Sequence, residues 1–207
     1  MDMSIDWLKL VAALLLLLCP AGVFHGRQVH FRALSRDWHG YWRRSILLWT
    51  AGFDLVRAGI GVWLLKDAVL RLPEAQGLMR HAPMLAQAGV LVLASAVQTL
   101  VCRERDAMLA PFAFVVGVVF GYLPPLIVVF GLALAVVVAM GTRSGAAFFP
   151  ALAVGTVATG YLFTQKSLLL PLVIAATTVI LPWMLTLLLS RHFVVPYQGH
   201  HARKHLH

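Results

Sequence analysis

Charged side chains are scarce in this chain. They make up 12% of its 207 residues, while hydrophobic residues make up 60%, and an ordinary soluble domain carries about 25% charged residues. The apolar residues are gathered into long runs, which excludes a single large soluble core. The sequence therefore predicts one all-α domain that spans a membrane several times.

Motifs for catalysis and metal binding are also missing. Neither G-x-S-x-G nor H-E-x-x-H occurs, and the only glutamates, Glu74 and Glu104, lie in predicted loops. None of the nine histidines lies deep in a predicted span, and Cys19 and Cys102 are too few for a disulfide framework or a zinc site. We therefore expect no metal and no cofactor, and a membrane enzyme is the least favoured class of function.

Seven apolar segments form the predicted bundle, which comprises residues 1–190. They lie at about 5–24, 45–65, 82–102, 107–123, 125–141, 146–163 and 168–190. Pro124 and Pro125 divide the long apolar run at 107–141, because a proline interrupts helical hydrogen bonding and disfavours helix in the residue before it. A single kinked helix through 107–141 is the alternative, and it would reverse the direction of every later span. Residues 191–207 form a basic, histidine-rich tail.

Lysine and arginine are unevenly divided between the two sides of this seven-span topology. Eleven lie on one side, with five in 25–44, two in 103–105, Arg143, and three in the tail. The other side has five, which are Lys9, Lys66, Arg71, Arg80 and Lys166. The positive-inside rule places the N-terminus outside and the C-terminus in the cytoplasm. We expect the membrane to be a bacterial-type inner (plasma) membrane.

The segment 25–44 combines aromatic and basic side chains at helical spacing. It predicts an amphipathic helix lying in the membrane interface, with aromatic rings at headgroup depth and guanidinium groups on phosphates. The candidate lipid-binding residues are Arg27, Arg32, Arg36, Trp38, Trp42, Arg43 and Arg44. An ordinary cytoplasmic loop that ends in an aromatic belt is the alternative. The net charge of +9 is thus explained by orientation and by anionic lipid headgroups, with no need for nucleic acid.

Asp54 and Arg57 are charged residues that lie deep inside a predicted span. They are three residues apart on one helical face, about 14 and 18 Å from the inner edge of that span. A lone charge at such depth costs at least roughly 3 kcal/mol, so the two are expected to pair. In the next span Gln87, Ser95 and Gln98 fall near one face. We predict a buried polar cluster of these five residues where the second and third spans meet, serving either as a structural lock or as a solute, ion or proton site.

Gly117 and Gly121 form a G-x-x-x-G pattern in the fourth predicted span. Glycines at this spacing allow two helices to approach closely. We expect the pair to pack inside the bundle rather than to mediate dimerisation.

Two functions follow from these features. The first is a non-catalytic multi-span protein, a subunit or scaffold of a membrane assembly, whose partners are the bilayer, its anionic headgroups and other membrane subunits. The alternative is a small transporter or channel that uses the Asp54–Arg57 cluster. The almost wholly apolar fifth and seventh spans favour the first, because a polar solute path would need more lining.

Overall fold

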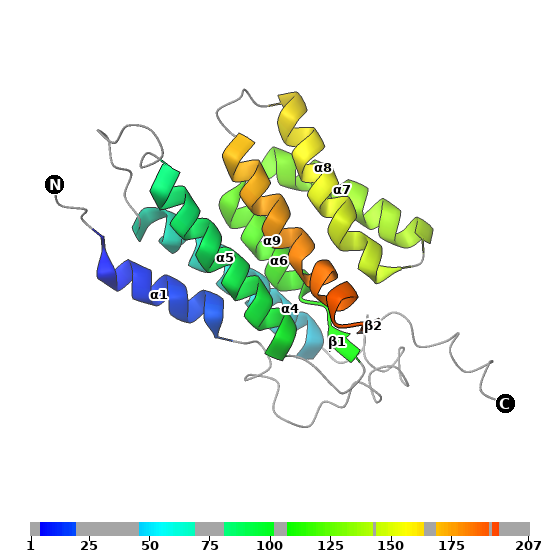
Figure 1. The fold of residues 1–207 in the computed structure, drawn as a ribbon, viewed down its shortest axis with the longest axis horizontal. Helices are drawn as coiled ribbons and strands as arrows, with labels where there is room; N and C mark the ends of the chain where they lie inside the picture. The colour runs from blue at the N-terminus through cyan, green and yellow to red at the C-terminus, as the bar shows by residue number, and fades with distance from the viewer. Residues whose placement is uncertain are drawn as a thin grey trace.

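The computed structural model describes residues 5–19, 46–68, 81–101, 107–142, 144–163, 169–190 and 192–194. These residues are helical apart from isolated turns and two three-residue strands. The elements in order are α1 (Trp7–Leu18), α4 (Ile46–Ala68), α5 (Ala82–Val101), β1 (Ala107–Leu109), α6 (Phe112–Tyr122), α7 (Pro125–Thr142), the 3-10 turn η3 (Gly145–Ala147), α8 (Phe148–Phe163), α9 (Leu169–Leu188) and β2 (His192–Val194) (Figure 1). The predicted interfacial helix at 25–44, Cys102 and most of the basic tail lie outside the described residues.

Local chemistry explains where several helices begin and end. Asp6 caps α1, because its side chain accepts a hydrogen bond of 3.2 Å from the amide of Lys9. The helix ends at Leu18, and Cys19 is already extended, as expected for a residue that precedes a proline. Helix α1 is therefore shorter than the predicted segment 5–24, whose last five residues lie outside the described ones. Pro125 opens α7 at the position where a missing amide costs nothing.

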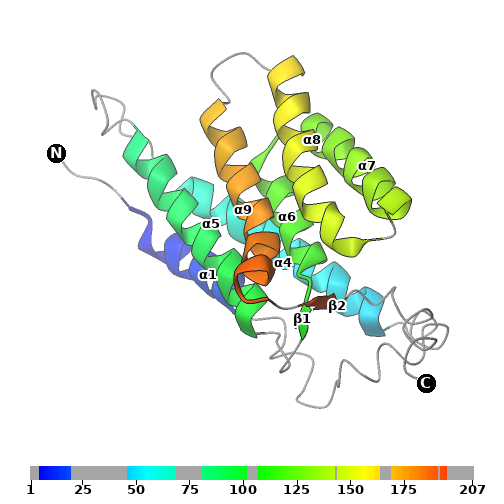
Figure 2. The ribbon, with the colours of Figure 1, turned by 45° about the vertical axis from the view of Figure 1, so that its right-hand side comes forward.

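The chain reverses direction between α6 and α7. Strands β1 and β2 pair in parallel, so the start of α6 and the end of α9 lie at one end of the molecule (Figure 2). Helix α6 thus runs away from this end and α9 runs towards it. Helix α8 packs against both α9 and α7. In Figure 1 each of these successive helices runs opposite to the one before it. The segment 107–142 therefore contains two separate helices of opposite direction after a short strand, where sequence reasoning left a single kinked helix open.

Helices α4 and α6 pack closely and run parallel. A Cβ atom on Gly117 would lie 2.9 Å from the Cβ of Ala58, and one on Gly121 would lie 2.8 Å from the carbonyl oxygen of Gly59 and 2.9 Å from the Cβ of Val62. Real Cβ atoms essentially never approach so closely, so a larger residue would push the helices apart. The G-x-x-x-G pattern of α6 is thus used inside the bundle, against α4.

Small residues also bring α7, α8 and α9 together. Gly131 of α7 faces Thr156 of α8, and Gly160 of α8 faces Leu172 of α9. At the other end of α8, the rings of Phe148 and Phe149 lie 5.1 and 5.0 Å from the ring of Phe112 at the start of α6. Small and aromatic residues therefore pack α8 against α6, α7 and α9.

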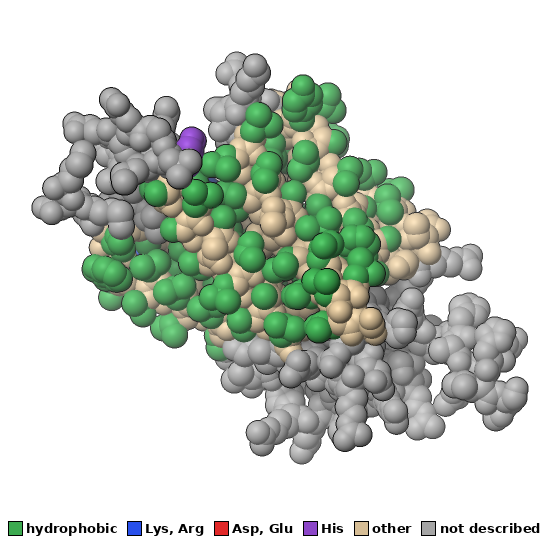
Figure 3. Space-filling view, in the orientation of Figure 1, with side chains coloured by type: hydrophobic (Ala, Val, Ile, Leu, Met, Phe, Trp, Pro, Cys, Tyr) green, Lys and Arg blue, Asp and Glu red, His purple; other side chains and the backbone are tan. Residues whose placement is uncertain are grey.

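Four helical stretches are long and apolar enough to cross a membrane within the described part of the chain: 82–100, 125–142, 145–163 and 169–188. Their outward faces carry large hydrophobic side chains such as Leu93, Val137, Val154 and Leu188. On the face drawn in Figure 3, hydrophobic side chains are spread over the described residues and charged side chains are nearly missing from them. Such a surface would be unstable in water, so these features indicate an integral membrane protein.

Candidate functional site: a polar cluster at the end of α1

Asp54 and Arg57 form a buried ion pair on α4. The guanidinium Nε of Arg57 donates to Oδ1 of Asp54 over 3.1 Å, and Nη2 donates to the same oxygen. The exposed fraction is 2% for the side chain of Arg57 and 12% for that of Asp54. The i, i+3 spacing brings the two groups together on one face, as expected from the sequence, and each charge offsets the cost of burying the other.

The same guanidinium also caps the C-terminal end of α1. Nη1 of Arg57 donates to the carbonyl oxygen of Cys19. The last carbonyls of any helix lack amide partners within that helix, and they carry the negative end of the helix dipole. A guanidinium stabilises this helix end in two ways, since it donates hydrogen bonds to the carbonyls and its positive charge interacts favourably with the dipole. Arg57 therefore binds the end of α1, while Asp54 on the same helix as Arg57, α4, balances its charge.

Gln98 of α5 completes the cap. Its amide Nε2 donates to the carbonyl oxygen of Leu17 over 3.1 Å and to that of Cys19 over 2.9 Å. Arg57 of α4 and Gln98 of α5 thus converge on Cys19, which is 38 and 79 residues away from them in the sequence. Helix α1 lies between α4 and α5 and packs on both. The polar groups predicted for a direct contact between the second and third spans meet instead at the end of the first.

Helix α6 supplies an aromatic wall beside the cluster. The guanidinium carbon of Arg57 lies 5.9 Å from the ring centre of Phe114, which is itself fully buried. A cation at this distance over an aromatic face is stabilised by the ring quadrupole. Groups from α1, α5 and α6 therefore meet around Arg57 of α4.

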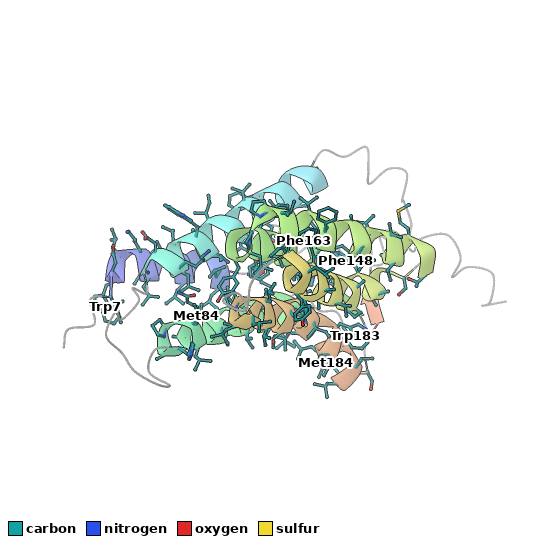
Figure 4. All side chains as sticks on the ribbon, turned by 90° about the horizontal axis from the view of Figure 1, so that it is seen from above. Trp7, Met84, Phe148, Phe163, Trp183 and Met184 are labelled. Atoms are coloured by element: carbon teal, nitrogen blue, oxygen red, sulfur yellow. The ribbon has the colours of Figure 1, made fainter. Side chains whose placement is uncertain are left out.

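Ser95 serves a different helix. Its hydroxyl donates to the carbonyl oxygen of Thr178 in α9 over 3.1 Å. Thr178 is four residues before Pro182, which lies inside α9. Because proline has no amide hydrogen, it leaves the carbonyl of the residue four positions earlier without its helical donor. Ser95 fills this gap from α5. In Figure 4 α9 turns aside near the labelled Trp183 and Met184, just past Pro182.

The remaining predicted site residues are dispersed. Gln87 is buried in α5, three helical turns before Gln98 and well away from Arg57. The arginine and tryptophan residues predicted to bind lipid between 25 and 44 lie outside the described residues. Within the part of the chain that the structure describes, no group of three or more His, Cys, Asp or Glu residues could hold a metal ion.

The cluster can hold charge and backbone in place, but it offers little for chemistry. It contains no nucleophile paired with a base. Every fully buried side-chain nitrogen and oxygen of the described residues has a hydrogen-bond partner. The ion pair is almost closed to its surroundings. This arrangement is typical of a structural lock.

Sequence reasoning found the side chains of this cluster and missed its backbone acceptors. The missed groups are the backbone carbonyls of Leu17, Cys19 and Thr178. Pro20 and Pro182 are the signals that could have revealed them. Pro20 ends α1, so that its last carbonyls lack helical donors, and Pro182 supplies no amide to the carbonyl of Thr178.

The comparisons with known proteins give no relative for this chain: no protein-family model, no curated protein and no solved structure matches it.

Proposed function

We propose that this chain is a non-catalytic, multi-span integral membrane protein that serves as a subunit or scaffold of a membrane assembly and contacts anionic lipid headgroups. The observation that carries the proposal is the closed state of the Asp54–Arg57 pair. Its side chains are 12% and 2% exposed, and the guanidinium is occupied by Asp54 and by the carbonyl oxygen of Cys19. A transport site would need at least one polar group open to a solute.

The proposed topology has seven spans, with the N-terminus outside and the C-terminus in the cytoplasm. The alternating helix directions support it. Asp6 at the start of α1 donates its amide to the carbonyl oxygen of Ala68 at the end of α4 over 3.3 Å, so these two helices are antiparallel. Strand β2, which follows α9, lies at the opposite end of the molecule, next to the start of α6. The start of α1 and the end of α9 therefore lie at opposite ends of the molecule, which is what an odd number of spans requires.

A flux assay tests the function. The purified protein is reconstituted in vesicles and compared with Asp54→Asn for movement of protons, monovalent ions and small solutes. We expect no flux from either protein and a lower unfolding midpoint for the variant, because Arg57 loses its charge partner. Flux through the native protein that Asp54→Asn abolishes would refute the scaffold function and establish transport.

Lipid contact is tested separately. Replacement of Arg32, Arg36, Arg43 and Arg44 by Ala should weaken the binding of a fluorescent anionic phospholipid to the detergent-solubilised protein, since each basic group near the membrane surface contributes about 1 kcal/mol. Replacement of Arg71 and Arg80 by Ala, on the other proposed side, is the matched control. Equal binding by the native protein and the fourfold variant would contradict the proposed contact.

One observation favours a small transporter as the second candidate. Helix α1 has only 12 residues, and its end lies beside the middle of α4. Helices that stop inside the membrane occur in transporters, where their ends bind solutes or ions. Here the end of α1 is bound by Arg57 and Gln98, so this candidate requires those two side chains to exchange for a solute, which the flux assay would detect.

A further inference from the structure

Three exposed aromatic residues lie at the same end of the molecule on three helices. Trp7 opens α1, Trp63 lies in the second-last turn of α4, and Tyr161 lies in the last turn of α8. Their exposed fractions are 67%, 63% and 73%. The alternating helix directions bring the start of α1 and the ends of α4 and α8 to the same end of the bundle (Figure 1). Tryptophan and tyrosine side chains exposed at one level are typical of a membrane–water interface.

Exposed charges lie at the same end of the molecule. Nζ of Lys9 contacts the carboxylate of Asp67 and lies 3.5 Å from Oδ2 of Asp6. Nζ of Lys66 lies 3.4 Å from the carbonyl oxygen of Tyr122, at the end of α6. Lysine side chains at helix ends extend their charged groups to the interface. The exposed aromatic residues and the exposed charged residues are thus two independent indications of a membrane–water boundary at this end of the molecule.

Helix α1 starts at this boundary and stops well inside it. Its 12 residues extend about 18 Å along the helix axis, against about 34 Å for the 23 residues of α4. The carbonyl of Cys19, directly after α1, accepts from Arg57, which is 11 residues from either end of α4. In Figure 1 the end of α1 falls clearly short of the level that α4, α5 and α9 reach at the lower right.

A helix that ends at this depth needs protein groups to bind its last carbonyls. Lipid tails offer no donors, and each unsatisfied backbone group in the hydrocarbon costs several kcal/mol. Arg57 and Gln98 supply three hydrogen bonds to the carbonyls of Leu17 and Cys19. The next described residue, Ile46, lies at the far end of α4.

We propose that the end of the molecule bearing Trp7, Trp63 and Tyr161 is a membrane-interface surface that binds the headgroup region of the bilayer. Helix α1 enters the membrane from this surface and stops near the bilayer centre, where Arg57 and Gln98 bind its last carbonyls. This inference rests on the proposed integral membrane function and adds the position of the bilayer. The buried ion pair therefore lies at the depth at which α1 ends.

Depth measurements with nitroxide labels test this placement in reconstituted vesicles. Single cysteines replace Leu8 and Leu15 on the exposed face of α1, in a protein whose native cysteines are changed to Ser. Collision rates with oxygen and with a water-soluble nickel chelate report the depth of each label. We expect Leu15 to be deeper than Leu8 by up to about 10 Å, which is seven residues at 1.5 Å each.

Labels on α7 provide the matched control for a complete crossing. Leu126, Leu134 and Met140 are exposed along this helix and should be shallow, deep and shallow in turn. Leu15 should approach the depth of Leu134. Equal, shallow depths for Leu8 and Leu15 would show that α1 lies on the membrane surface and would overturn the inference while leaving the α7 pattern intact. Loss of the α7 pattern as well would instead contradict the integral membrane function.

Discussion

Replacing Arg57 by Met should destabilise the bundle more than any other single change to a charged residue of the described helices. Methionine keeps much of the side-chain length but removes every donor. Three partners are affected, because Oδ1 of Asp54 and the carbonyl of Cys19 lose hydrogen bonds and the ring of Phe114 loses its cation. Gln98 still donates to Leu17 and Cys19, so the end of α1 stays partly capped.

The expected cost is about 3–5 kcal/mol, the usual range when one partner of a buried ion pair is removed. Asp54→Asn should cost less, about 1–3 kcal/mol, because Arg57 keeps the carbonyl of Cys19 as an acceptor. The double variant Asp54→Asn with Arg57→Met should be more stable than Arg57→Met alone, since it leaves no unpaired carboxylate inside the protein.

Reversible unfolding in mixed micelles with increasing SDS measures these differences by circular dichroism. Lys66→Met is the matched control, because Lys66 is exposed and lies 3.4 Å or more from its carbonyl partners. It should change the free energy of unfolding by less than about 1 kcal/mol. If Arg57→Met costs no more than Lys66→Met, the guanidinium does not hold the end of α1 and the account of the cluster is wrong.

Two further predictions concern helix packing. Ser95→Ala should cost about 1 kcal/mol, because it leaves the carbonyl of Thr178 without a donor; in a Pro182→Ala background the restored amide should remove most of that cost, and an unchanged cost in this double-mutant cycle would contradict the link. Gly117→Ala should destabilise by about 1–3 kcal/mol through overlap with α4, whereas Gly89→Ala, where nothing lies within 4 Å of an added Cβ, should be neutral or stabilising by up to about 1 kcal/mol. Equal effects of the two glycine substitutions on the SDS unfolding midpoint would argue against a close α4–α6 contact.

The positions of the helices were largely predictable from the sequence. Long apolar runs and prolines are local signals, and the predicted break at Pro124 and Pro125 corresponds to the gap between α6 and α7. The pairing of Asp54 with Arg57 was predictable for the same reason, since a spacing of three residues sets their distance within one helix. The early end of α1 was missed, because the apolar run continues past Pro20 and outweighed it.

The partners of the buried polar groups depended on the tertiary structure. Each proline creates a local need for a hydrogen-bond donor, and that need can be read from sequence at Cys19 and at Thr178. The donors come from Arg57, Gln98 and Ser95, tens of residues away, and only helix packing brings them within reach. The sequence by itself determined a membrane-spanning helical chain with a charged pair in one helix. The tertiary structure decided that Arg57 of this pair binds the end of α1. The reason is that local sequence determines which carbonyls lack a donor, whereas long-range packing determines which side chain donates to them.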